Sequence, residues 1–236
     1  MVDVLRNALL RSLLPVVTVA IAGCVVSPQP SPPVDAPELD GGLVSVGLTP
    51  ESLLESVTVT GAPGTVDPAE GTVIINNLDR DDAPSLAPVR PDGSFEIVVG
   101  GAVTEVLRLQ VRAQDARSAP VDLLLDGSAS GLAPAPVDFA CLTIEPDLWL
   151  ALDGQGDARS IVLTNDCADA VTIAAPRLRR GLAGFTFAPT APFELAVGET
   201  TTVTVRSTTS TQEDEDVLFF EIVAPTAGRR AITITR

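Results

Sequence analysis

Short runs in which apolar and polar residues alternate recur along this chain, and they constrain its fold more than any other feature. Alternate side chains of a β-strand point to opposite faces, so a period of two predicts strands with one buried face. No segment keeps a helical period for ten residues, apart from a weak pattern at 48–57. The sequence therefore predicts an all-β protein. In residues 106–113 the predicted inward residues are Leu107, Leu109, Val111 and Ala113, and the predicted outward residues are Arg108, Gln110 and Arg112.

The alternating runs fall into two blocks separated by a segment of small, turn-forming residues at 127–136. Seven runs lie between residues 137 and 236, a number and spacing typical of a β-sandwich. In the first block Asp92-Gly93 supplies the positive φ that a tight turn needs before the strand at 94–100. We therefore predict two tandem sandwiches joined by a hinge.

The first 23 residues have the pattern of an export signal. Arg6 and Arg11 form a basic start, and a charge-free, mostly apolar run follows from Ser12 to Ile21. As a helix this run would span roughly 15 Å, too short for a hydrocarbon core of about 30 Å. A signal peptide is the preferred interpretation, and a membrane-anchoring helix is the alternative.

The segment Ile21-Ala22-Gly23-Cys24 resembles the lipobox of bacterial lipoproteins. The resemblance implies that Cys24 becomes the new N-terminus and holds the protein on the membrane through its acyl chains. Residue 25 is Val rather than Asp, which by the same resemblance favours the outer membrane. A plain secretory signal with an incidental cysteine remains the alternative.

A proline-rich segment, residues 25–40, follows the cysteine. Such a sequence favours extended polyproline II, at about 3.1 Å per residue, and could reach roughly 50 Å. We interpret it as a tether that keeps the globular part away from the bilayer. A ligand for a proline-reading domain is the alternative.

Short strand and turn motifs recur in both blocks: Val57–Gly61, Asp92–Phe95 and Ala113–Leu123 in the first, and Thr164-Asn165, Val171–Ile173, Pro192–Glu199 and Thr202–Val205 in the second. On these segments the first block resembles the immunoglobulin-like domains of bacterial surface proteins, and the second resembles hydin-type or major-sperm-protein-like immunoglobulin folds. The resemblance implies the fold and says little of activity, because one scaffold hosts unrelated functions. The predicted organisation is a signal peptide (1–23), the lipidated cysteine and linker (24–41), a first sandwich (42–126), a hinge (127–136) and a second sandwich (137–236).

With Cys24 assigned to the lipid, Cys141 and Cys167 remain as an even pair in an exported domain. Exported thiols oxidise, so we predict a disulfide, which would stabilise the fold by roughly 3 kcal/mol in the chain-entropy model. Two separate buried thiols are the alternative. We assign nearby Trp149 to packing in the core or between domains, rather than to a platform for stacking sugars.

Three acidic groups could hold a cation. Asp79, Asp81 and Asp82 form the densest group of oxygen ligands and are a candidate Ca²⁺ site, with a solvated, charged loop as the alternative. The segment 153–157 lacks the glycine and the glutamate of a calcium loop and is predicted to be a hairpin turn. The run 213–216 is predicted to be a solvated loop end.

Composition excludes several functions. All 15 basic residues are Arg, and the chain has no His, Lys or Tyr. Ser-His-Asp catalysis, imidazole metal sites and Schiff-base chemistry are therefore excluded. A formal charge of −16 argues against nucleic acid as a partner.

The sequence as a whole predicts a non-catalytic lipoprotein of the cell envelope that acts by binding or spacing at the membrane surface. The alternatives are an accessory subunit of a secretion, motility or surface-assembly machine and a glycan-binding module. Aromatic residues make up only 3% of the chain, which weighs against the glycan reading. The partner would be an envelope protein or a glycan, with no cofactor other than Ca²⁺.

Overall fold

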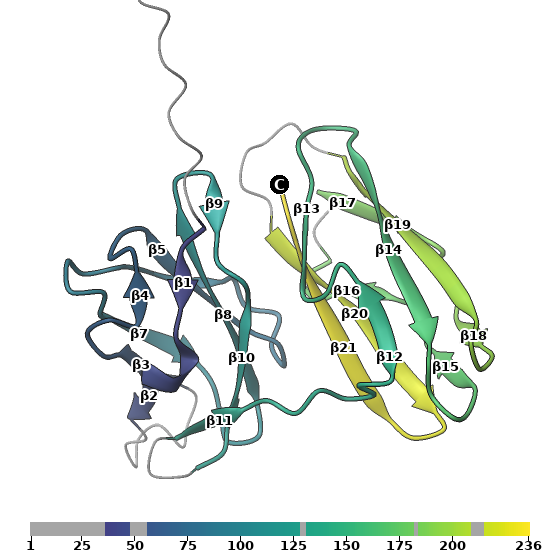
Figure 1. Cartoon of the computed structure of the whole chain (residues 1–236), viewed down its shortest axis with the longest axis horizontal. Coiled ribbons are helices and arrows are strands. Elements are labelled where there is room, and N and C mark those ends of the chain that lie inside the picture. The colour runs from purple at the N-terminus through teal and green to yellow at the C-terminus, as the bar shows by residue number, and fades with distance from the viewer. Residues whose placement is uncertain (1–35, 48–55, 128–130, 182–183, 209–214) are drawn as a thin grey trace, which may run out of the picture. The chain divides into compact units, whose positions relative to one another are not determined.

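The computed structural model describes residues 36–47, 56–127, 131–181, 184–208 and 215–236, and in this part of the chain it confirms the all-β prediction (Figure 1). A single short 3-10 helix, Gly41–Leu43, interrupts the described strands. The predicted signal peptide, Cys24 and most of the tether lie outside the described residues, as does most of the weak helical pattern at 48–57. Among the described residues, no helix has the length and apolar character that a membrane span requires.

The first sandwich consists of two main sheets that enclose one hydrophobic core. Its core side chains include Val59, Phe95 and Leu109, each fully buried. The Phe95 ring lies where a Cβ atom of residue 61 would stand, so Gly61 is what allows this packing. One sheet has the order β2 (Val44–Gly47), β3 (Ser56–Gly61), β7 (Phe95–Gly100); the other has the order β11 (Leu132–Pro134), β10 (Val121–Leu125), β8 (Val106–Ala113), β5 (Thr72–Asn77), β6 (Ser85–Pro88), with β9 (Ala116–Arg117) paired to β8.

The second sandwich has the same plan with its own core, which includes Leu163, Val203 and Phe220. Strand β13 pairs in parallel with β21, whereas the other pairs are antiparallel. One sheet has the order β12 (Leu142–Glu145), β14 (Ala158–Asn165), β19 (Thr200–Ser207), β17 (Phe185–Ala188); the other has the order β13 (Trp149–Ala151), β21 (Gly228–Thr235), β20 (Glu215–Ala224), β15 (Val171–Ile173), β18 (Phe193–Leu195), with β16 (Arg177–Leu178) paired to β20.

The segments predicted to be linkers take part in the fold where they are described. Strand β1 (Glu38–Leu39) lies within the predicted tether and pairs with β4 (Val66–Asp67). Strand β11 lies within the predicted hinge, pairs with β10 and buries Leu132 in the first core. Residues 34–236 form one compact unit. The predicted boundaries within it stay predictions.

The predicted disulfide is present between Cys141 and Cys167. Cys141 precedes β12 and Cys167 follows β14, and these two strands are hydrogen-bonded neighbours. The turn after β14 is held by Asn165, whose side chain accepts a hydrogen bond from the Cys167 amide and donates to the Leu195 carbonyl. The bridge therefore fastens a strand pair that the backbone ladder already joins.

The sheet that contains β20 is covered on both faces. Four consecutive residues, 217–220, are buried, although alternation would place two of them in solvent. Leu218 and Phe220 enter the core of the second sandwich, whereas Val217 and Phe219 form a separate small cluster with Leu78 of the first sandwich. The second face of this sheet is therefore buried against the first sandwich.

The inward face predicted for residues 106–113 is correct, and the outward face is covered rather than open to solvent. Leu107, Leu109 and Val111 are fully buried in the first core, as predicted. Arg108 and Gln110, predicted to point outward, are each only 1% exposed. The reason is that the second sandwich covers the outer face of this strand, as the contacts of Arg108 show.

Candidate functional site: the interface between the two sandwiches

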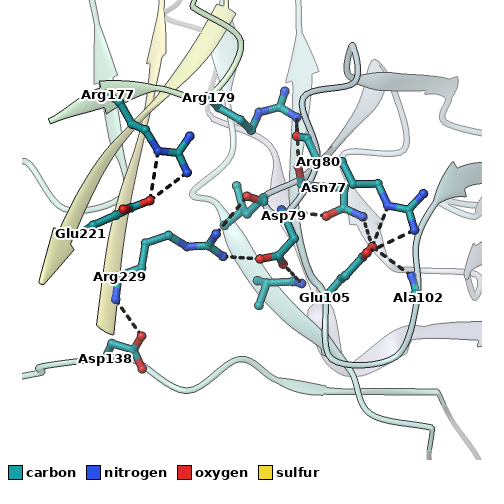
Figure 2. A network of polar contacts seen from close by, with 12 residues as sticks. Asn77, Asp79, Arg80, Ala102, Glu105, Asp138, Arg177, Arg179, Glu221 and Arg229 are labelled. Atoms are coloured by element: carbon teal, nitrogen blue, oxygen red, sulfur yellow. Dashed lines mark hydrogen bonds and ion pairs between the residues drawn. The ribbon is translucent and has the colours of Figure 1, made fainter. Parts of the chain in front are cut away.

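The interface between the sandwiches is defined by the outer faces of two sheets, the one containing β5, β8 and β10 and the one containing β13, β20 and β21. Its apolar centre consists of Leu78, Val217 and Phe219, with Val106 and Ala231 packed against them. Polar contacts surround this centre, and many of them come from arginines (Figure 2). The interface thus combines a small hydrophobic cluster with a surrounding hydrogen-bonded network.

Arg179 crosses from the second sandwich to the loop that follows β5. Its guanidinium donates to the carbonyls of Asn77 at 2.9 Å and Arg80 at 2.7 Å, and to Oδ1 of Asn76 at 2.8 Å. The residue is 4% exposed, and burial lowers the pKa of its guanidinium below the usual value while the nearby carboxylate of Asp216 opposes that shift. An arginine keeps its charge under such a shift, so this is a buried cation solvated by protein carbonyls.

Arg229 makes a second crossing, and Figure 2 shows its guanidinium reaching Asp79. Its guanidinium donates to the Leu78 carbonyl at 3.2 Å and pairs with Oδ1 of Asp79 at 2.9 Å. The same guanidinium lies 4.9 Å from the ring centroid of Phe219, at a distance where a cation attracts an aromatic face. Its position therefore joins the polar network to the apolar centre.

Arg108 crosses in the other direction, from β8 of the first sandwich. It forms a two-pronged ion pair with Asp122, with both distances 2.7 Å, and donates to the Leu148 carbonyl at 3.1 Å in the second sandwich. Its remaining contact is with the hydroxyl of Thr233 at 3.3 Å. It is the largest fully buried side chain among the described residues, so its charge depends wholly on these partners.

The acidic run at 213–216 corrects a prediction, because its two described members are buried rather than solvated. Glu215 accepts from Asn76 at 2.6 Å and pairs with Arg117 of the first sandwich at 2.7 Å. Asp216 is 1% exposed and accepts from the amides of Arg180 and Val217. Both carboxylates begin strand β20, where the interface supplies the donors that water would supply at an exposed loop end.

The loop that receives Arg179 and Arg229 is itself braced from within the first sandwich. Glu105 accepts from the side chains of Asn77 at 2.6 Å and Arg80 at 2.9 Å and from the Ala102 amide at 3.0 Å. Burial alone would raise the pKa of Glu105, but these hydrogen bonds outweigh it, so the net pKa lies below the usual 4.5. Glu105 therefore holds the loop in place in its ionised form.

The three candidate Ca²⁺ ligands all lie in this loop, but one of them, Asp79, is engaged in contacts with other protein groups. Asp79 pairs with Arg229 through Oδ1 and accepts from the Val106 amide at 2.7 Å through Oδ2. Asp81 and Asp82 are exposed. Across the described ranges, no group of three His, Cys, Asp or Glu is arranged to hold a metal ion. The Ca²⁺ site stays a prediction, and Asp79 has a structural role that the sequence did not indicate.

The second acidic segment, 153–157, forms a turn. Asp157 accepts from the Asp153 and Ala158 amides at 2.9 Å each, and Arg159 pairs with both aspartates. Gly156 takes a φ of +82°, which its lack of a side chain permits. The predicted turn is therefore present, but it is not a hairpin, because β13 pairs with β21 whereas β14 pairs with β12 and β19 in the other sheet.

Trp149 lies at the edge of the interface rather than in either core. It is half-buried on β13, and its indole nitrogen donates to the Thr235 hydroxyl at 2.9 Å. The expectation of packing at a domain interface therefore agrees with its position. One side of the residue lines an open cleft between the sandwiches.

Sequence reasoning missed the interface because it assigned arginines and acids to solvent. One signal was present in the sequence: residues 217–220 are all apolar and break the alternation, which is typical of a strand covered on both faces. Residues 73–75 carry the same signal.

The chain resembles known proteins only remotely. No protein-family model matches it, and no curated protein sequence does. Similar solved structures include SSP-19, an MSP-domain-like protein of Caenorhabditis elegans (16% identity, 40% of this chain and 97% of that chain, TM-score 0.35). Others are the E. coli chaperone DraB (10% identity, 40% and 54%, TM-score 0.34) and the D0-D1 domain of intimin (12% identity, 85% and 100%, TM-score 0.30). At these scores the similarities say nothing of binding or catalysis.

Proposed function

We propose that this chain is a lipid-anchored, non-catalytic module of the bacterial cell envelope that holds two β-sandwiches as one body at the membrane surface. In this proposal Cys24 carries the acyl chains and the proline-rich segment sets the distance from the bilayer. The two sandwiches then present their loops and sheet faces to an envelope protein or a glycan.

The observation that supports the proposal is the buried interface between the sandwiches. A flexible pair of domains needs no charged side chains buried between them, whereas Arg108 and Arg179 are both at least 96% buried and donate across the interface. Opening the interface would leave these cations to find new partners, which is costly for a buried charge. The arrangement therefore suits a rigid spacer, in which the two sandwiches keep a fixed orientation, better than two domains joined by a flexible hinge.

The anchor is tested by growing cells with an alkyne-bearing fatty acid and detecting the label on the purified protein. We expect the label on the native chain and its loss, together with release from the membrane fraction, in Cys24→Ser. The control is Cys141→Ser with Cys167→Ser, which removes the disulfide but should keep the label. An unlabelled native chain would reject the anchor.

Rigidity is tested by measuring the distance between spin labels placed at Glu96 of the first sandwich and Glu194 of the second, both exposed. We expect one narrow distance distribution in the native background and a broad one in Arg179→Ala. A broad distribution in both would reject the proposed rigid coupling.

Binding is tested by crosslinking the full-length protein in its own cells and identifying what purifies with it. A stoichiometric protein partner would place the chain in an assembly, whereas its absence would favour a spacer or a module that faces a glycan.

A further inference from the structure

An open cleft of about 790 Å³ lies beside the interface, at the edge where the β8–β9 hairpin of the first sandwich approaches β13 and the end of β21. This volume is within the range of ligand sites, roughly 300–1,000 Å³, and such sites are common where two domains meet. The side chains that shape it include Arg112, Gln114, Asp115 and Arg117 from the hairpin and Trp149, Asp153 and Arg236 from the second sandwich.

The cleft offers both hydrogen-bond donors and acceptors together with an aromatic surface. Three arginines and a glutamine supply planar donors, two aspartates supply acceptors, and Trp149 supplies a half-buried indole. The three positive and two negative charges of these side chains nearly cancel, so they give a highly charged ligand little net attraction. A ligand with many hydroxyl groups, each able to donate and accept, matches this set.

The hairpin that forms one wall has a residue whose conformation its local sequence does not favour. Ala113 pairs with Ala116, so Gln114 and Asp115 form a two-residue turn, and Gln114 takes a φ of +51°. Gly, Asn and Asp are the residues that adopt positive φ easily in such turns. Residue 114 nevertheless has a long amide side chain, and this residue lines the cleft.

Trp149 is held in place on the opposite wall. Its indole nitrogen is engaged by the Thr235 hydroxyl, which fixes the ring on the outer face of β13. The base of the cleft is also fixed, because Arg117 pairs with Glu215 across the interface. Both walls therefore keep their spacing as long as the interface is closed.

From these observations we infer that the cleft between the β8–β9 hairpin and Trp149 binds an oligosaccharide, with the indole against a sugar ring and Gln114, Asp115 and Asp153 bonding its hydroxyl groups. The inference deepens the proposed function, because it commits to its glycan partner and names the site. It does not depend on Cys24, because it concerns residues of the two sandwiches alone.

The test uses the full chain in a detergent without a sugar headgroup. A glycan array of neutral and acidic oligosaccharides selects the probe, which is then titrated against the protein. Trp149 is the only tryptophan and the chain has no tyrosine, so the intrinsic emission reports on the cleft itself. We expect a saturable change in emission and slower quenching by acrylamide when the sugar is bound.

The cleft is assigned with Gln114→Ala combined with Asp115→Ala, which we expect to weaken binding roughly tenfold or more. The matched control is Asp169→Ala, an exposed acid outside the cleft, which should bind as the native chain does. Three outcomes would overturn the inference: no glycan bound on the array, binding that the double variant leaves unchanged, or an emission change that inorganic sulfate reproduces.

Discussion

Replacing Arg179 by Ala tests whether the interface depends on its buried cation. The substitution removes three donors at once and leaves the carbonyls of Asn77 and Arg80 and the Oδ1 atom of Asn76 without them. It also removes a cation whose charge interacts with the buried Asp216. The variant therefore leaves buried polar groups at the interface without hydrogen bonds, which lowers the free energy of unfolding.

The size of the effect follows from the surroundings of these bonds. Those to Asn77 and Asn76 are buried, whereas the one to Arg80 is partly exposed and water can replace it. Two buried hydrogen bonds to a charged group contribute about 1.5–3 kcal/mol each, so we expect a loss of about 3–6 kcal/mol. With an m-value of about 2–3 kcal/mol/M, a loss near the middle of this range lowers the urea midpoint by roughly 1.5–2 M.

Urea unfolding followed by Trp149 emission and by circular dichroism provides the assay, because coincident transitions justify the free-energy comparison. Arg179→Met restores most of the packing but not the donors, so its loss should lie between native and Ala. Arg90→Ala, which breaks an exposed pair with Glu96, is the control and should cost less than about 1 kcal/mol. A midpoint for Arg179→Ala equal to that of the control would refute the reasoning.

Three further predictions concern the disulfide, the acid limb of stability and the acidic loop. Replacing Cys141 and Cys167 together by Ser should lower stability by roughly 3 kcal/mol, for a loop closed over 26 residues, and should abolish the effect of reductant on the melting temperature. Glu105 has a pKa below its usual 4.5, so its contribution is present above that pH and is lost as the pH falls through the lowered value. Glu105→Gln should therefore be less stable than the native chain at pH 7 and should lose less stability between pH 5 and about pH 3; parallel pH profiles would contradict this. Asp79→Asn should lower the melting temperature in calcium-free buffer, since it weakens the pair with Arg229; a rise of the native melting temperature in millimolar Ca²⁺ that the variant loses would instead support the predicted cation site.

The strands and turns could be predicted because their signals are local. Gly93 takes a φ of +79° and the Ser94 amide donates to Asp92, as the Asp92-Gly93 pair predicts. The alternation of 106–113 identified the residues that enter the first core. The disulfide was predicted from the even number of cysteines that remain once Cys24 is assigned to the predicted lipid anchor.

The interface could not be predicted in the same way because its partners are far apart in sequence. Arg179 and Asn76 are separated by 103 residues, and Arg117 and Glu215 by 98. Arginines are usually exposed, and the free-energy cost of burying one is offset only when such partners are present. Glu215 and Asp216 were predicted to be solvated for the same reason, because the residues next to them in sequence do not reveal the distant groups that donate to them.

The small cluster of Leu78, Val217 and Phe219 affects how this protein could be divided or recombined. A fragment beginning at residue 137 would expose Val217 and Phe219 next to Glu215 and Asp216, while a fragment ending at residue 136 would expose Leu78 and Arg108. Each half would then carry an apolar patch flanked by charges without partners, which favours aggregation. The two sandwiches should therefore be expressed, or moved into another protein, together as a pair. A fusion or truncation is best made before residue 36, outside both sandwiches.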